Sequence, residues 1–123
     1  MRIRMRIALS VACLLLLAAG CGKDRVEKLS EQLEDGKAKT RRHASRDLRN
    51  MGAAAQAAVP KLAEALKDKE PKVRQIAATA LGKIGPDARE AINPLTAATK
   101  DSSPQVREAA ALALNKIRRK PRS

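Results

Sequence analysis

His43 and Asp47 are the one pair of residues in this chain whose types and spacing could support acid–base chemistry. His43 is the only histidine. Asp47 stands four residues later, so a helix would place both side chains on one face. A carboxylate in that position can orient an imidazole as a general base. No serine, cysteine or second carboxylate has a sequence relation to the pair that would complete a site. We therefore interpret the pair as a local ion pair and predict that the chain is not an enzyme.

Metal, cofactor and substrate sites have little basis in the sequence. A single histidine excludes a multi-histidine metal site, and no glycine-rich loop that could hold a phosphate is present. Ala and Leu dominate the apolar residues, and there is no Phe, Tyr or Trp. Small apolar side chains favour closely spaced helices over a roomy pocket. We expect no metal, no cofactor and no small-molecule substrate.

Cys21 is the second candidate for chemistry, because it follows a segment typical of export signals. Arg2, Arg4 and Arg6 form a basic start, residues 7–19 are apolar with one serine, and small residues end the segment. That run is too short to span a bilayer comfortably as a permanent helix. The pattern predicts a cleaved signal peptide over residues 1–20.

The five residues Leu17-Ala18-Ala19-Gly20-Cys21 resemble the lipobox of bacterial lipoproteins, although Ala18 stands where that family most often has Leu. The resemblance implies that Cys21 becomes the first residue and carries a diacylglyceryl or fatty acyl lipid. Cys13 is the only other cysteine, so the exported chain would contain one thiol and no disulfide. The alternative is an ordinary signal peptide cut near Gly20, with a free thiol at Cys21. Gly22 replaces the aspartate that marks inner-membrane retention in proteobacterial lipoproteins, so we expect the cell envelope, at the periplasmic side of the outer membrane if the source is Gram-negative.

The rest of the chain repeats itself with a period of 33 residues. Five sets of residues keep this spacing: Val26, Val59 and Ile92; Leu29, Leu62 and Leu95; Asp35, Asp68 and Asp101; Arg41, Arg74 and Arg107; Leu48, Leu81 and Leu114. A period of this length indicates supersecondary units that must stack to bury their apolar faces. We divide the chain into the lipidated end and a short linker (21–25), an array (26–117, with units 26–58, 59–91 and 92–117) and a basic disordered tail (118–123).

Each unit contains two helical patterns joined by a turn, so the predicted fold is all-α. In the second unit the first helix is expected over residues 59–67, with Pro60 in its first turn, and Pro71 opens the second helix. The second helix carries one apolar stripe with a 3.6-residue period, and Gly85-Pro86 ends it. In the first unit His43 and Asp47 replace two apolar positions of this stripe, as expected of a terminal repeat with one flank in solvent.

Two segments carry a resemblance to HEAT repeats, in particular to the short bacterial PBS-lyase-like type. They are Asp68-x-x-Pro71-x-Val73-Arg74-x-x-Ala77-x-x-Ala80-Leu81-x-x-Ile84-Gly85 and Asp101-x-x-Pro104-x-Val106-Arg107-x-x-Ala110-x-x-Ala113-Leu114-x-x-Ile117. The resemblance implies an α-solenoid of about three helical hairpins that binds proteins. It also implies that the turn aspartates and the arginines six residues later form a hydrogen-bonded ladder between units: Asp35, Arg41, Asp68, Arg74, Asp101 and Arg107.

The charge of the chain favours anionic partners. The net charge is +13, and removing the three arginines of the signal leaves +10. Arg42, Arg46 and Arg49 share one helix face, which we call the basic stripe. The resemblance places second helices on the concave surface, so we predict a binding surface that runs from this stripe to a nearly neutral far end: Arg42, Arg46, Arg49, Gln75, Thr79, Glu108 and Leu112.

These observations predict a lipid-anchored scaffold for an acidic protein partner, with anionic lipid head groups as a further ligand. Nucleic acid is the alternative ligand of a basic concave face, but the export signal and the absence of aromatic residues for base stacking speak against it. A non-catalytic relative of bilin lyases is the weakest alternative, because those arrays are longer. Leu112 and the lack of an obvious polar cap after Ile117 predict self-association, or a docked partner, at the C-terminal end.

Overall fold

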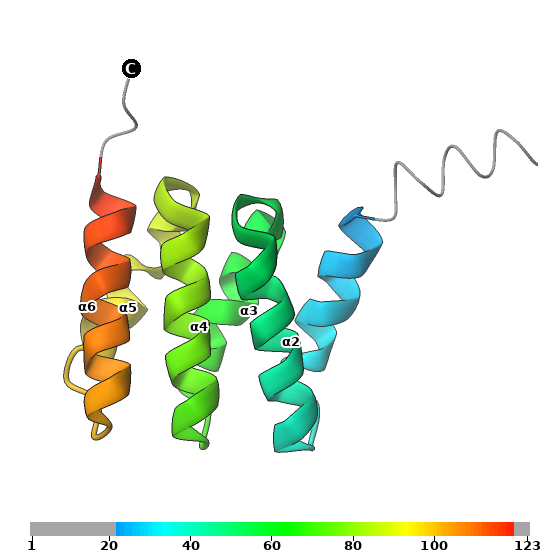
Figure 1. The fold of residues 1–123 in the computed structure, drawn as a ribbon, viewed down its shortest axis with the longest axis horizontal. Helices are drawn as coiled ribbons and strands as arrows, with labels where there is room; N and C mark the ends of the chain where they lie inside the picture. Colours follow the sequence, from blue (N-terminus) through cyan, green and yellow to red (C-terminus); the bar gives the residue numbers. More distant parts are fainter. Residues whose placement is uncertain (1–21, 120–123) are drawn as a thin grey trace, which may run out of the picture.

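The computed structural model describes residues 22–119 and shows a row of stacked helical pairs (Figure 1). Residues 22–32 are helical and precede seven further elements. These are α2 (Ala38–Met51), the 3₁₀ helix η1 (Gly52–Ala58), α3 (Val59–Ala65), α4 (Pro71–Ile84), the 3₁₀ helix η2 (Gly85–Ala91), α5 (Ile92–Ala98) and α6 (Pro104–Arg118). No strand occurs in residues 22–119. The predicted all-α array is confirmed.

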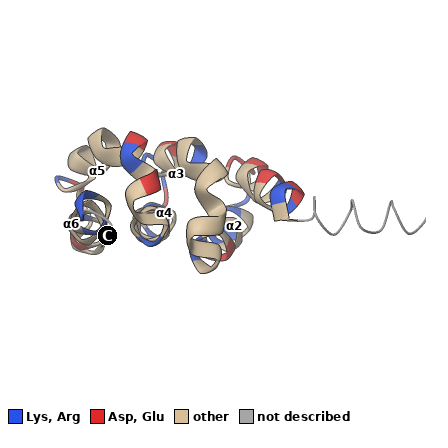
Figure 2. Cartoon of the chain, turned by 90° about the horizontal axis from the view of Figure 1, so that it is seen from above, with Lys and Arg blue, Asp and Glu red and all other residues tan. Residues whose placement is uncertain are grey.

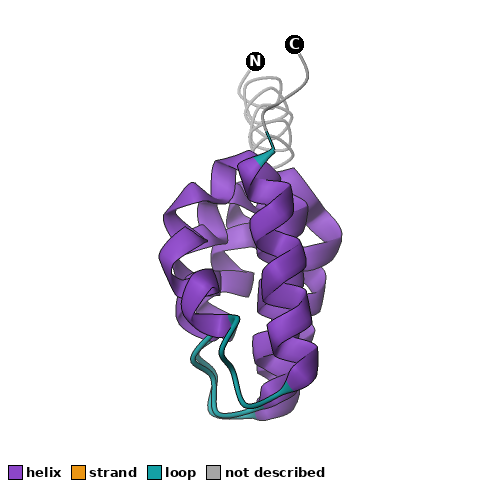
Figure 3. Ribbon diagram, turned by 90° about the vertical axis from the view of Figure 1, so that its left-hand side faces the viewer, coloured by secondary structure: helices purple, strands orange, loops and turns teal. Residues whose placement is uncertain are grey.

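The helices form two layers. The second helices of the three units, α2, α4 and α6, stand side by side, and α4 packs against both of its neighbours (Figure 1). The first helices α3 and α5 form the layer behind them (Figure 2), and the 3₁₀ helices η1 and η2 connect each second helix to the first helix that follows it. The turns that join the two helices of each unit lie together at one edge of the array (Figure 3). Every buried apolar residue of the core lies between Val26 and Ile117.

The ends of the long helices follow from proline and glycine. Pro71 and Pro104 occupy the first positions of α4 and α6, where a missing N–H leaves no hydrogen bond unmade. Gly52 and Gly85 follow the last residues of α2 and α4 with φ of 56° and 78°, a region that favours glycine. The corresponding position of the third unit is Arg118, and α6 continues to it.

Small residues allow the second helices to approach closely. A Cβ atom built on Gly82 of α4 would lie 3.0 Å from the Cα of Ala113 of α6, so nothing larger than glycine fits there without a shift. Ala78 and Ser45 are fully buried at the corresponding junctions. The larger core residues are leucines in both layers, including Leu48, Leu62, Leu81 and Leu95, all fully buried.

Four details differ from the sequence-based expectation. The 3₁₀ helices η1 and η2 were not predicted, because a run with i to i+3 bonding carries no 3.6-residue pattern. Helix α3 ends at Ala65, two residues earlier than predicted, because the N–H groups of Leu66 and Lys67 bond to carbonyls only three residues back. Residues 22–25 are helical and do not form a linker, and Arg118 belongs to α6, not to a disordered tail.

The remaining expectations for the ends of the chain fall on residues 1–21 and 120–123, outside the described part. These include the signal peptide and Cys21. Within residues 22–119 no helix has the length and apolar character that a membrane crossing requires.

Candidate functional site

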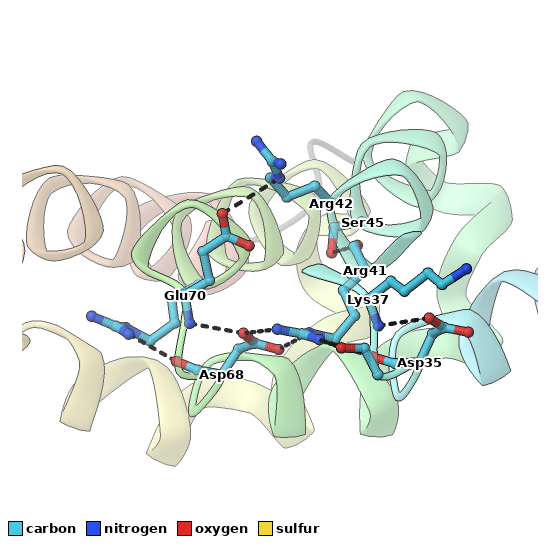
Figure 4. Close-up of polar contacts among 9 residues, drawn as sticks. Asp35, Lys37, Arg41, Arg42, Ser45, Asp68 and Glu70 are labelled. Carbon is cyan, nitrogen blue, oxygen red and sulfur yellow. Dashed lines mark hydrogen bonds and ion pairs between the residues drawn. The ribbon is translucent and has the colours of Figure 1, made fainter. Parts of the chain in front are cut away.

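The predicted ladder residues make the principal polar contacts between units. Arg41 donates from Nε to Oδ2 of Asp68 at 2.7 Å and from Nη2 to Oδ1 at 3.3 Å (Figure 4). Arg74 repeats this pairing with Asp101, at 2.9 and 3.0 Å. Two-point pairing of a guanidinium with a carboxylate fixes geometry as well as adding energy. Each arginine therefore joins its own unit to the turn of the unit that follows.

The same arginines also hold their own turns. Nη1 of Arg41 donates to the backbone oxygen of Asp35 at 2.9 Å, and Nη1 of Arg74 donates to that of Asp68 at 2.8 Å. Arg107 makes the same contact with the backbone oxygen of Asp101 at 2.8 Å. At each of the two junctions, one buried or half-buried arginine therefore binds both carboxylate oxygens of the next turn and a backbone oxygen of its own turn. This arrangement makes the ladder a structural device and not an open binding site.

The turn aspartates are fixed from their own side as well. Oδ1 of Asp68 accepts from the backbone N–H of Glu70 at 2.9 Å, and Oδ1 of Asp101 accepts from Ser103 at 2.9 Å. The side-chain hydrogen bond from Arg74 lowers the pKa of Asp101 below its usual value, and the bond from Ser103 acts in the same direction. The carboxylate is therefore stabilised in its charged form at this junction.

The two ends of the ladder are exposed. The carboxylate of Asp35 accepts the N–H of Lys37 at 2.8 Å but is paired with no arginine side chain among the described residues. Arg107 is bound by its own turn and meets no carboxylate there. The sequence spacing identified these six residues but did not assign which aspartate each arginine binds.

The basic stripe is only partly open to solvent. Arg46 is exposed, whereas Arg42 and Arg49 are half-buried. Nε of Arg42 lies 3.4 Å from Oε1 of Glu70, an ion pair between α2 and the start of α4 (Figure 4). Nε of Arg49 is buried and has no hydrogen-bond partner within the described chain. The stripe therefore faces α4 on one side and solvent on the other.

A small depression lies at the open side of the stripe. It has a volume of about 150 Å³ and is lined by Lys39, Arg42, His43 and Arg46. All four side chains can carry positive charge, and no carboxylate lines it. Sequence analysis named Arg42 and Arg46 here but assigned His43 to a pair with Asp47. Among the described residues no hydrogen bond or ion pair joins His43 to Asp47, and His43 instead lines the depression.

The rest of the predicted binding surface changes character along the array. Gln75 and Thr79 are half-buried on α4, and Thr79 donates to the backbone oxygen of Gln75 at 3.0 Å. Glu108 and Leu112 are exposed on α6. Leu112 is 54% exposed and is the one large hydrophobic residue in the described region with such exposure. The surface is basic at α2, neutral at α4 and mixed at α6.

A larger groove was missed by sequence analysis. It has a volume of about 570 Å³ and lies between the helical residues 22–32 and η1, with Val26, Met51, Ala54 and Ala57 in its walls. It exists because no unit precedes residues 22–32 in the described part, so the apolar side of η1 is only partly covered. The signal in the sequence was the Ala-rich run of residues 53–58, whose small side chains leave space beside them.

No three His, Cys, Asp or Glu side chains of residues 22–119 gather as metal ligands would.

Comparison with known proteins identifies the repeat. A family profile described as HEAT repeats matches residues 26–115. Two crystal structures of engineered proteins are similar to this chain, each with a TM-score of 0.64 over 75% of it, at 29% and 25% sequence identity. The chain spans less than half of either engineered protein, 46% and 44% of their lengths. No curated protein matches the chain.

Proposed function

Because this chain belongs to the HEAT-repeat family, we propose that it is a non-catalytic scaffold that binds another protein on the surface formed by α2, α4 and α6. The carrying observation is the pair of arginine–aspartate junctions, which hold three second helices in fixed register. A surface held in this way is preorganised, so a partner loses little free energy in ordering it. The side chains behind this surface pack in the hydrophobic core.

We propose an acidic partner, because the open part of this surface is basic where it begins. Lys39, Arg42, His43 and Arg46 converge on one depression, and only Arg42 has an acidic neighbour at ion-pair distance. The exported chain would carry a net charge of +10, which would also steer an acidic protein toward it. An acidic side chain inserted between Arg46 and Lys39 would meet two cations that have no competing carboxylate in the depression.

We further propose that the scaffold is attached to a membrane through lipid on Cys21. The support is the sequence of residues 1–21, which combines a basic start, a short apolar run and a lipobox-like end. Residues 22–32 are helical, so the array would follow the anchor almost directly. The basic stripe would then lie close to the bilayer, where anionic head groups are a second class of ligand.

Site-specific photocrosslinking in the intact chain tests the scaffold proposal. A photoreactive amino acid in place of Arg46 should capture an acidic protein from membranes, whereas the same residue in place of Glu90, which is exposed on η2, should not. Equal capture at both positions would contradict a partner-binding surface on α2. If position 46 captured only lipid, the basic stripe would bind the membrane surface and not a protein.

A further inference from the structure

The outer face of α6 matches faces that are covered elsewhere in the array. Ser45 of α2 and Ala78 of α4, which are each followed by a further unit, are fully buried, whereas Ala111, at the corresponding position of α6, is exposed. Arg107 is exposed too, although its Nη1 is held by the backbone oxygens of Asp101 and Ser102 at 2.8 and 3.2 Å. In the two earlier units this posture directs Nε and Nη2 at a carboxylate. Arg107 is therefore set to bind a carboxylate that residues 22–119 do not provide.

The first unit presents the matching half of this junction. Oδ1 of Asp35 accepts the N–H of Lys37 at 2.8 Å, as Oδ1 of Asp68 accepts the N–H of Glu70 at 2.9 Å. In Asp68 this posture presents the carboxylate to the arginine of the preceding unit. Asp35 is exposed and its carboxylate is held in the same way, but no arginine in the described part of the chain binds that carboxylate. One end of the array thus offers an arginine and the other an aspartate.

The repeat period gives the contacts that would form if a second copy continued the stack. At the internal junctions Arg74 meets Asp101, Arg42 meets Glu70, and Gly82 packs on Ala113. Adding whole repeats of 33 residues to both members of each contact gives the residues that would meet if a second copy followed α6. In this way three residues of α6 lie opposite three residues of the first unit of that copy. The pairs are Arg107 with Asp35, Glu108 with Lys37, and Asn115 with Asp47.

All three pairs are complementary. Two join opposite charges, and the third joins an amide to a carboxylate that it can donate to. The third pair is informative because later units have Ala80 and Ala113 where the first unit has Asp47. A buried aspartate facing an alanine would be left without a hydrogen bond. Asn115 stands where α2 has Arg49 and α4 has Gly82. Because a Cβ at Gly82 already lies 3.0 Å from Ala113, the Asn115–Asp47 pair needs α6 and the next α2 to stand farther apart than α4 and α6 do, and Asn115 then provides the donor.

We propose that a second copy of this chain docks head-to-tail on the outer face of α6, with Arg107 bound to Asp35 of that copy. The exposed Leu112 lies beside this face and is positioned to add apolar contact at its margin. The interface is heterologous, because the two copies use different surfaces. Copies joined in this way extend into rows and do not stop at a dimer. The positive charge of the chain opposes association over long range, so rows form at salt concentrations that screen it.

Disulfide trapping in the full-length chain tests the register. A Cβ built on Gly82 would lie 3.2 Å from the Cβ of Ala113, close to the 3.5–4.5 Å of a disulfide. The same relation joins Asn115 to Asp47 of the second copy, so Asn115→Cys/Asp47→Cys should give reducible dimers, trimers and longer rows. The controls are the two single variants, which account for Cys13 and Cys21, and Asp47→Cys/Asn93→Cys, which places the second thiol on α5. Rows of equal yield in any control would overturn the proposal.

A charge exchange in the same double-cysteine background tests the Arg107–Asp35 contact. Arg107→Glu alone and Asp35→Arg alone should each lower the yield of rows about tenfold, the effect of losing about 1.4 kcal/mol of association free energy. An equimolar mixture of the two variants should restore the yield, because each mutated end then meets its complement in the other chain. Circular dichroism of each variant shows whether the fold is kept. Folded variants that form rows as well as the parent, or a mixture that fails to recover, would show that no second copy docks through these residues.

Discussion

Arg74 of one unit binds Asp101 of the next through two parallel hydrogen bonds of 2.9 and 3.0 Å. Both side chains are nearly buried, with 12% and 13% of their surface exposed. A third bond, from Nη1 to the backbone oxygen of Asp68 at 2.8 Å, ties the same guanidinium to its own turn. One residue therefore fixes the shape of a turn and the spacing of two units.

Loss of this arginine should destabilise the array. Hydrogen bonds to charged groups contribute about 1.5 to 3 kcal/mol each, so we expect Arg74→Ala to lower the free energy of unfolding by at least that amount. Arg107→Ala is the matched control, because that side chain makes the turn contact but no bond to a carboxylate in the described chain. Urea unfolding followed by circular dichroism measures both. Equal stability of Arg74→Ala and the parent would show that the ladder does not stabilise the fold.

The junction also predicts a dependence of stability on pH. The hydrogen bond from Arg74 lowers the pKa of Asp101 from its ordinary value of 3.8, so the folded state binds this proton more weakly than the unfolded state. The stabilisation is therefore complete above about pH 4 and is lost as the pH falls through the lower pKa of the folded state. Asp101→Asn should be less stable than the parent at pH 7, and this difference should shrink at about pH 2. A difference that stays constant between the two pH values would mean that charge on Asp101 is not responsible.

Gly82 tests how close α4 and α6 must be. A Cβ there would lie 3.0 Å from backbone atoms of Ala113, and overpacking of this kind costs about 1 to 3 kcal/mol. We expect Gly82→Leu to lower the urea midpoint, and Gly36→Leu, where a Cβ meets no atom within 4 Å, to change it little. A Gly82→Leu variant as stable as the parent would mean that the two helices can separate without loss.

The sequence predicted the helices well because their cause is local and periodic. The sequence shows apolar residues on a 3.6-residue spacing, Pro71 and Pro104 at helix starts and Gly85 at a helix end. The 3₁₀ helix over Gly52–Ala58 was not, because seven mostly alanine residues suit several conformations and tertiary packing selects one. The sequence also did not show which aspartate each ladder arginine binds. That assignment depends on how far one unit is displaced from the next, which only the stacked structure gives.

The basic stripe shows the same limit. Its three arginines were predicted to share one helix face. The structure divides them between solvent at Arg46, an ion pair with Glu70 at Arg42 and a partly buried position at Arg49. Helical spacing places side chains on a face, but the neighbouring helix decides how much of that face remains open.

Lipid attachment through Cys21 stays a prediction and can be tested directly. Cys21→Ser should abolish labelling by a radioactive fatty acid and release the protein from membranes, because the thiol is the proposed acylation site. Cys13→Ser is the matched control and should leave both unchanged. Membrane association and labelling that persist in Cys21→Ser would contradict the lipoprotein proposal, whatever the array itself binds.

Binding to anionic membranes tests whether the basic stripe, or only the net charge of the whole chain, attracts the protein to the membrane. Each basic side chain near an anionic surface contributes about 1 kcal/mol, and the effect fades over about 8 Å at physiological salt. The mature chain with Cys21→Ser should bind vesicles that contain anionic lipid and release them as salt rises. Changing Arg42, Arg46 and Arg49 to Gln should weaken this binding about thirtyfold to 150-fold, the lower value applying if Arg42 remains paired with Glu70.

The control for this experiment removes the same charge elsewhere. Changing Lys69, Arg89 and Lys100 to Gln lowers the net charge equally at three exposed positions outside α2. If the stripe is the contact surface, this variant should bind nearly as well as the parent, because its lost charges lie on two turns and on η2 and not on the face of α2 that carries the stripe. Equal loss in both triple variants would mean that the vesicles respond to net charge alone, and the stripe would then have no role of its own at the membrane.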